Sequence, residues 1–156
     1  MRYERSGASK VSSKENVMQV KDAMHKGVEW ASPDTPLREI AKLMRQHDIG
    51  AVPIGDGDKL VGMVPDRDIV CNGLAASNFD FATAKARDVM TKGIHTCRAE
   101  DELGAAVVHM QDLKVRRLPV IDRSKRMVGM LSLGDVGHAA PTEIAADCLK
   151  RVASHH

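Results

Sequence analysis

The chain has 156 residues, of which 43% are hydrophobic and 28% are charged, a balance typical of soluble globular proteins. Aromatic residues make up only 3%, which argues against stacking platforms for single-stranded nucleic acid. The formal net charge of +2 is too small for the basic surface that nucleic-acid binding requires. No apolar run approaches the ~20 residues of a membrane-spanning helix. We therefore expect neither a nucleic-acid-binding nor a membrane protein.

The three cysteines, Cys71, Cys97 and Cys148, are single and widely spaced. This pattern gives neither a disulfide framework nor a Cys-x-x-Cys motif, and it favours a cytoplasmic location. Residues 1–16 are polar and rich in Ser, Lys, Arg and Glu, a composition that predicts a flexible N-terminal arm.

The rest of the chain contains an internal repeat. Lys-Asp-Ala-Met at 21–24 recurs as Arg-Asp-Val-Met at 87–90, and Val-Gly-Met at 61–63 recurs at 128–130. The offset is 66 residues in the first case and 67 in the second, so one residue is inserted between them. Because this period is too long for a solenoid, two copies predict a pair of small units related by a pseudo-twofold axis.

Each unit shows the same order of predicted elements. A short helix (20–24; copy 86–90) precedes Lys-Gly, and a strand follows (28–31; copy 94–97). Thr35 as N-cap and Pro36 as first helical residue then predict a helix, whose copy begins in the acidic stretch 100–102. Its apolar face has helical spacing and comprises Leu37, Ile40, Ala41 and Met44, repeated as Leu103, Ala106, Val107 and Met110. Two strands joined by a turn follow (51–54 and 60–64; copies 118–121 and 127–131), and a last helix begins at 66 or 133.

The order β-α-β-β-α predicts a mixed α/β fold of the α+β kind, with two pseudo-twofold-related repeats packed sheet to sheet. We expect repeat 1 at 17–73, a linker at 74–85, repeat 2 at 86–138, and a C-terminal helix and tail at 139–156. Neither repeat alone is long enough to bury much core, so the two are expected to fold together.

Two segments carry a family resemblance. Residues 62–70 (Gly-Met-Val-Pro-Asp-Arg-Asp-Ile-Val) and 129–136 (Gly-Met-Leu-Ser-Leu-Gly-Asp-Val) are similar to the Gly-h-h-(Thr/Ser)-x-x-Asp segment of cystathionine-β-synthase (CBS) domains, where h is hydrophobic. The preceding strands contain the hydrophobic-Pro-hydrophobic triplet of that family at 52–54 and 118–120. Over residues 17–138 the chain thus resembles a CBS pair, or Bateman module.

The resemblance implies a regulatory function. CBS pairs commonly bind AMP, ADP or ATP in two clefts between the repeats, form homodimers, and regulate an effector protein without being catalytic. We expect the same here, with an adenosine nucleotide as regulatory ligand and no obligatory cofactor. The effector is unknown from sequence.

The second copy of the motif is complete and implies the better nucleotide site. Ser132 can hold a phosphate together with helix N–H groups, and Asp135 can accept both ribose hydroxyls. Arg116 is the expected phosphate partner because a guanidinium matches phosphate geometry. The adenine is expected near the first repeat, with this site comprising Gly27, Val28, Glu29, Gly50, Ala51, Val52, Arg116, Ser132 and Asp135.

The first copy departs from the pattern. Pro65 replaces the hydroxyl residue and supplies neither a hydroxyl nor an N–H group. A degenerate site, or one for a nucleoside-like group, is therefore expected, comprising Pro65, Asp68, Ile94, His95, Arg117 and Leu118.

Simpler interpretations stay open for these residues. Asp68 and Asp135 could serve only as first-turn acids that favour the helix dipole. Arg116 and Arg117 face opposite sides of a strand, so one could bind ligand while the other is a surface charge. Trp30 could be core or could line a cleft or a dimer interface.

Three classes of function follow. The leading hypothesis is the nucleotide-sensing module, and the alternative is a ligand-free interaction or scaffold protein of the same fold, which Pro65 favours. An enzyme is disfavoured because no nucleophile–base pair, metal cluster or phosphate-binding loop is evident. The histidines are scattered without metal-ligand spacing, so no metal site is expected.

Overall fold

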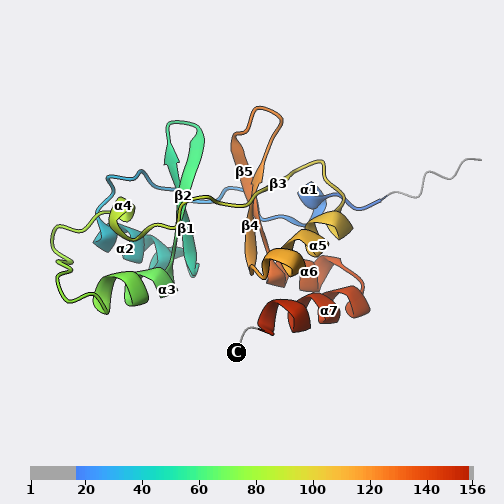
Figure 1. Ribbon diagram of the computed structural model, residues 1–156. Helices are drawn as coiled ribbons and strands as arrows, with labels where there is room; N and C mark the ends of the chain where they lie inside the picture. Colours follow the sequence, from blue (N-terminus) through green and yellow to red (C-terminus); the bar gives the residue numbers. More distant parts are fainter. Residues whose placement is uncertain (1–16, 155–156) are drawn as a thin grey trace, which may run out of the picture.

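The computed structural model describes residues 17–154. The arm predicted for residues 1–16 lies outside them. Two similar halves lie side by side, with a β-hairpin of each half at the centre and the helices on the outer sides (Figure 1). This arrangement confirms the predicted α+β class and the facing sheets. None of the described helices is both long and apolar enough to cross a membrane.

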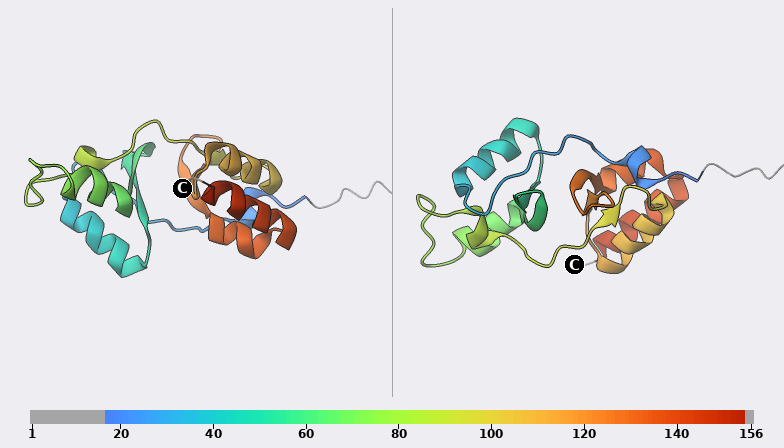
Figure 2. Two further views of the ribbon diagram at one scale, coloured as in Figure 1. Left: turned by 60° about the horizontal axis from the view of Figure 1, so that its bottom comes forward. Right: turned by 90° about the horizontal axis from the view of Figure 1, so that it is seen from above.

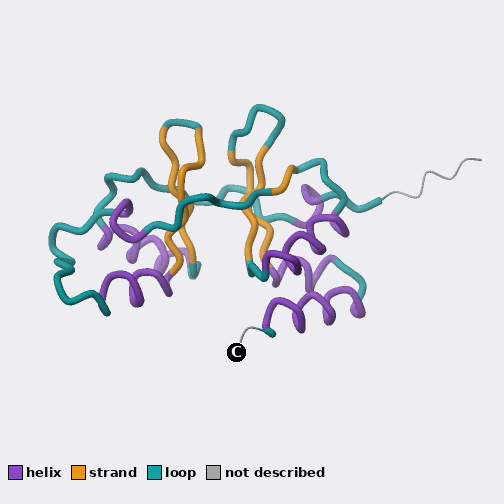
Figure 3. Tube along the Cα trace, in the orientation of Figure 1, coloured by secondary structure: helices purple, strands orange, loops and turns teal. Residues whose placement is uncertain are grey.

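The elements follow the repeat (Figure 3), and η1 is a single π-helical segment. They are α1 (Val20–Ala23), α2 (Leu37–His47), β1 (Ala51–Asp56), β2 (Lys59–Pro65), α3 (Asp66–Asp68), η1 (Ile69–Leu74), α4 (Ala86–Val89), β3 (Cys97–Arg98), α5 (Leu103–Leu113), β4 (Arg117–Ile121), β5 (Met127–Ser132), α6 (Leu133–Ala139) and α7 (Thr142–Ala153).

The two sheets are small and share an irregularity. Strands β1 and β2 form an antiparallel hairpin, and β4 and β5 form another, to which β3 adds in parallel. The register shifts after Ile54 in one hairpin and after Val120 in the other. These positions are 66 residues apart, so the internal repeat extends to this detail of the backbone.

The predicted first strands are largely wrong. Within 28–31 only Ala31 pairs, by a single parallel bridge to Ile54. Within 94–97 only Cys97 belongs to a strand, the two-residue β3. The reason is that each segment crosses between the halves. It begins on one hairpin, where His25 pairs with Met130 and Thr91 pairs with Met63, and only its end reaches the other.

The crossing exchanges the first helices of the repeats. Val20 of α1 is fully buried in the core of the second half, with Leu118 and Leu131 among its members. Ala86 and Val89 of α4 are buried in the core of the first half. Figure 2 shows the same exchange, with α1 lying among the helices of the second half. Each core is therefore complete only when both repeats are folded.

An ion-pair cluster fixes α4 to the first half. Asp34, in the loop before α2, accepts a hydrogen bond from Lys85 Nζ at 3.2 Å and pairs with Arg87 Nη2 at 2.6 Å. The hydrogen bond from Lys85, with both positive charges, lowers the pKa of Asp34 below its usual value. The cluster thus links the start of the second repeat in sequence to the first half in space.

The start of α2 differs by one residue from the prediction, and the predicted C-terminal helix is present. Helix α2 begins at Leu37 with Pro36 as N-cap, so the prediction of Thr35 as N-cap and Pro36 as first helical residue is one position early. Thr35 Oγ1 instead accepts a hydrogen bond from the Ser32 N–H at 3.0 Å. The predicted C-terminal helix is present as α7, which packs on α5 and α6 and buries Cys148 and Val152.

The cysteines differ in exposure, which predicts different reactivities. Cys71 is exposed, whereas Cys97 and Cys148 are buried. Burial raises the pKa of Cys97 to about 12 and also raises that of Cys148, so both thiols stay protonated and unreactive near pH 8. We expect a thiol-reactive chromophore to label one cysteine per folded chain quickly and the other two only after unfolding. The Cys71→Ser variant should show no fast phase, and rapid labelling of all three would contradict the buried positions.

Candidate ligand site between the repeats

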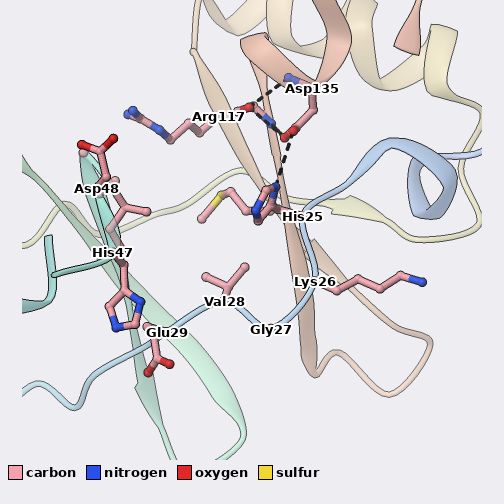
Figure 4. A pocket seen from close by; sticks show the side chains of 14 residues that line it. His25, Lys26, Gly27, Val28, Glu29, His47, Asp48, Arg117 and Asp135 are labelled. Atoms are coloured by element: carbon pink, nitrogen blue, oxygen red, sulfur yellow. Dashed lines mark hydrogen bonds and ion pairs between the residues drawn. The ribbon is translucent and has the colours of Figure 1, made fainter. Parts of the chain in front are cut away.

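A cavity of about 480 Å³ lies between the two halves, and we call it the main cleft. Its walls come from the segment 25–29, the end of α2 and start of β1 (47–51), the start of β4, and the junction of β5 with α6 (Figure 4). The volume lies within the ~300–1,000 Å³ range of small-molecule sites. The main cleft therefore has the size and position of a ligand site shared by both repeats.

Most of the residues predicted for the better site line this cleft. Those present are Gly27, Val28, Glu29, Gly50, Ala51, Ser132 and Asp135. Val52 does not line it, because the alternation of β1 turns this side chain into the core, where it is fully buried. Sequence reasoning missed His25, Lys26, His47, Asp48, Ile49 and Met130, which also line the cleft.

Ser132 and Asp135 form a reciprocal cap at the start of α6. Asp135 Oδ2 accepts hydrogen bonds from the Ser132 N–H at 2.8 Å and from Ser132 Oγ at 2.7 Å, and the Asp135 N–H lies 3.1 Å from Ser132 Oγ. The second oxygen, Oδ1, lies 3.8 Å from His25 Nδ1, and His25 is itself paired with Met130 of β5. The carboxylate is thus held by one oxygen and presents the other toward His25 and the cleft.

This cap changes the expected role of the helix N–H groups. The Asp135 N–H is engaged by Ser132, and the Leu133 N–H donates to the Arg116 carbonyl at 2.9 Å. Two of the donors expected to hold a phosphate are therefore already bonded within the protein. A phosphate in this cleft depends more on side-chain cations.

The arginine that lines the main cleft is Arg117, whereas Arg116, which was predicted as the phosphate partner, does not line it. Arg117 is half-buried and pairs with Ser132 across the β4–β5 hairpin, whereas Arg116 precedes β4 and is exposed. A Cβ on Gly50 would lie 2.9 Å from Arg117 Nη2, so a larger residue at position 50 would displace the end of this side chain. The guanidinium therefore rests against the backbone of the first half.

The pseudo-equivalent region forms a smaller cavity of about 160 Å³, which we call the second cleft. Pro65, Ile94, His95, Arg117 and Leu118 line it as predicted, so Arg117 borders both clefts. Asp68 does not line it. The repeat places Thr91 where the other half has His25, and Thr91 Oγ1 donates to Asp68 Oδ2 at 2.6 Å. The carboxylate equivalent to Asp135 is therefore occupied by the protein itself.

Trp30 lies at the surface of the first half. Trp30 is 41% exposed and its ring covers Gly55, where a Cβ would collide with it. Trp30 thus packs on β1 from outside rather than lying in the core.

Within residues 17–154, no group of three or more His, Cys, Asp or Glu side chains lies close enough to share a metal ion.

The two halves and their clefts define a class of protein. The chain matches the CBS domain over residues 20–72 and again over 86–141, and it therefore belongs to the CBS domain family, with two copies forming a pair.

Among curated relatives, Hypoxic response protein 1 of Mycobacterium tuberculosis is 37% identical over 135 residues, which cover 86% of this chain and 93% of that protein. A crystal structure of Hypoxic Response Protein I with two coordinated zinc ions superposes with a TM-score of 0.71 at 38% identity, covering 80% of this chain and 100% of that one.

Two similar structures contain adenosine compounds. CBSX2 of Arabidopsis thaliana in complex with AMP has a TM-score of 0.69 at 25% identity, covering 78% of this chain and 95% of that chain. The CBS domain pair of MJ0100, in complex with 5′-methylthioadenosine and S-adenosyl-L-methionine, has a TM-score of 0.69 at 26% identity, with coverages of 78% and 94%. CBS pairs similar to this one thus bind adenosine-containing ligands.

Proposed function

We propose that this chain binds an adenosine nucleotide in the main cleft and acts as a regulatory module. One observation carries the proposal. Asp135, Arg117 and the segment 27–29 come from distant parts of the sequence and line the same cavity. The complexes of CBSX2 with AMP and of MJ0100 with adenosyl compounds support the same ligand class.

Each wall has a chemical role in this proposal. Asp135 Oδ1 accepts a ribose hydroxyl while Ser132 holds Oδ2 in place. The Arg117 guanidinium pairs with a phosphate. The segment 27–29 of the first repeat borders the adenine and leaves its backbone groups available to the base edge.

The regulatory step follows from the position of the ligand. A nucleotide that touches both halves favours the arrangement in which the main cleft fits it, and it shifts the population only by its differential affinity for the two arrangements. A homodimer and an effector protein in the cytoplasm complete the proposal. In this proposal the homodimer and the effector transmit the change in population, and the chain itself senses the ligand without catalysing a reaction.

A thermal-shift panel with AMP, ADP, ATP, NAD(H) and S-adenosylmethionine tests the proposal. A ligand at ~100 times its Kd adds about 2.7 kcal/mol, or about 5 to 10 °C in Tm for a chain of this size. We expect such a shift with at least one adenosine compound and none with the matched guanosine compound. If no compound shifts Tm in protein shown to be free of bound nucleotide, the ligand-free interaction module becomes the better description.

A further inference from the structure

We propose that the main cleft selects adenosine ligands carrying one phosphate group over those carrying two or three. This inference rests on the proposed nucleotide binding and adds the ligand class. It comes from the charges around the cleft. Lys26 and Arg117 are the permanently charged basic residues that line it, beside the histidines His25 and His47, whereas Glu29, Asp48 and Asp135 are acidic.

The two basic residues do not contribute equally. Figure 4 shows the Lys26 side chain extending away from the cleft, and Lys26 is exposed. Arg117 is half-buried, and its Nη2 atom lies 2.9 Å from the position that a Cβ of Gly50 would occupy. Of the permanent positive charges lining the cleft, Arg117 alone is directed against its opposite wall.

Carboxylates surround the place where Arg117 reaches. Asp66 Oδ2 lies 3.3 Å from the same Gly50 position, and Asp48 lines the cleft two residues before Gly50. Neither carboxylate forms an ion pair with Arg117 within 4.0 Å among the described residues. One phosphate can pair with the Arg117 guanidinium. A second or third phosphate would lie near the negatively charged carboxylates, with no further arginine or lysine directed toward it from the lining of the cleft.

Two more carboxylates line the rest of the cleft. Asp135 is bonded to Ser132, the strand partner of Arg117, and its Oδ1 lies 3.8 Å from His25 Nδ1, while Glu29 belongs to the segment 25–29. The second cleft also depends on Arg117, so it cannot supply a separate arginine to an extended phosphate chain. The charge pattern suits AMP and disfavours ADP and ATP in increasing order.

Titration calorimetry with adenosine, AMP, ADP and ATP tests this selectivity, with a chelator present so that no divalent cation masks the phosphates. We expect AMP to bind more tightly than adenosine and at least about tenfold more tightly than ATP. Higher ionic strength should narrow the gap between AMP and ATP, because these charges are partly exposed to solvent.

Three variants separate the causes. Arg117→Ala should lower AMP affinity to that of adenosine and leave adenosine unchanged. Asp48→Asn should raise ATP affinity more than AMP affinity, and asparagine tolerates the left-handed backbone at this position (φ 51°). Asp112→Asn removes an exposed carboxylate of α5 that lines neither cleft, and it should change nothing.

The outcomes distinguish this inference from the proposed function. ATP binding as tightly as AMP, or an unchanged ratio in Asp48→Asn, overturns the charge selectivity while nucleotide binding stands. If no adenosine compound binds the wild-type chain, the proposed function itself fails and the selectivity falls with it.

Discussion

Replacing Asp135 by asparagine is expected to weaken nucleotide binding by about 10- to 100-fold, the usual loss of a hydrogen bond to a charged group. The carboxylate uses Oδ2 for Ser132 and keeps Oδ1 for the ligand. An asparagine has one acceptor oxygen, so it can satisfy Ser132 or the ribose but not both. Titration calorimetry with AMP measures the loss.

The matched control is Asp68→Asn at the equivalent position of the first repeat. Thr91 already donates to this carboxylate at 2.6 Å, and Asp68 lines neither cleft. We expect AMP affinity to stay within about twofold of wild type, the size of an ordinary surface substitution. Loss of binding in Asp68→Asn with retention in Asp135→Asn would place the ligand in the first repeat's site and contradict our assignment.

Replacing Met110 by alanine is expected to lower the free energy of unfolding by about 2–5 kcal/mol, as for other large-to-small changes in a core. Met110 is fully buried in the second core, and α7 packs against its helix, α5. Urea unfolding followed by circular dichroism measures the change in midpoint.

The internal repeat supplies the control for this prediction. Met44 is the equivalent residue on α2, but it is only partly buried against the first core. Met44→Ala should therefore cost clearly less than Met110→Ala. Equal losses would mean that the two equivalent positions are equally enclosed, contrary to the difference in burial.

The sequence predicted much of the fold because the relevant patterns are local. The apolar spacing of α2 and α5 and the two hairpins follow from periodicity within short windows, and the repeat showed each element twice. The start of the last helix at residue 133 was predicted for the same reason, and α6 begins there. The cap between Ser132 and Asp135 was not predicted, although it also depends on residues only three apart.

The choice between the two arginines could not be made locally. Alternation along a strand places Arg116 and Arg117 on opposite sides, but which side borders the cleft depends on register. The pairing of Arg117 with Ser132 settles it. A one-residue error in the register exchanges the positions of Arg116 and Arg117. The sequence pattern around residues 115–118 does not determine that register.

The glycines at equivalent positions of the two repeats show a similar limit. The motifs around Gly62 and Gly129 do not indicate which segments pack against them. The structure places Met90 over Gly62 and Met24 over Gly129, with the His25 carbonyl 2.6 Å from a Cβ built on Gly129. The glycines make room for the crossing segments of the other repeat, which are 28 and 105 residues away in sequence.

The patterns in the chain therefore suffice to predict two equivalent units, their helices and hairpins, and a Ser–Asp motif suited to a nucleotide. The exchange of α1 and α4 between the cores, the shortened first strands and the place of Arg117 required the folded molecule. These features depend on contacts between residues far apart in sequence. Periodicity and capping report only a residue's near neighbours, so they cannot show which distant segment completes a core or a cleft.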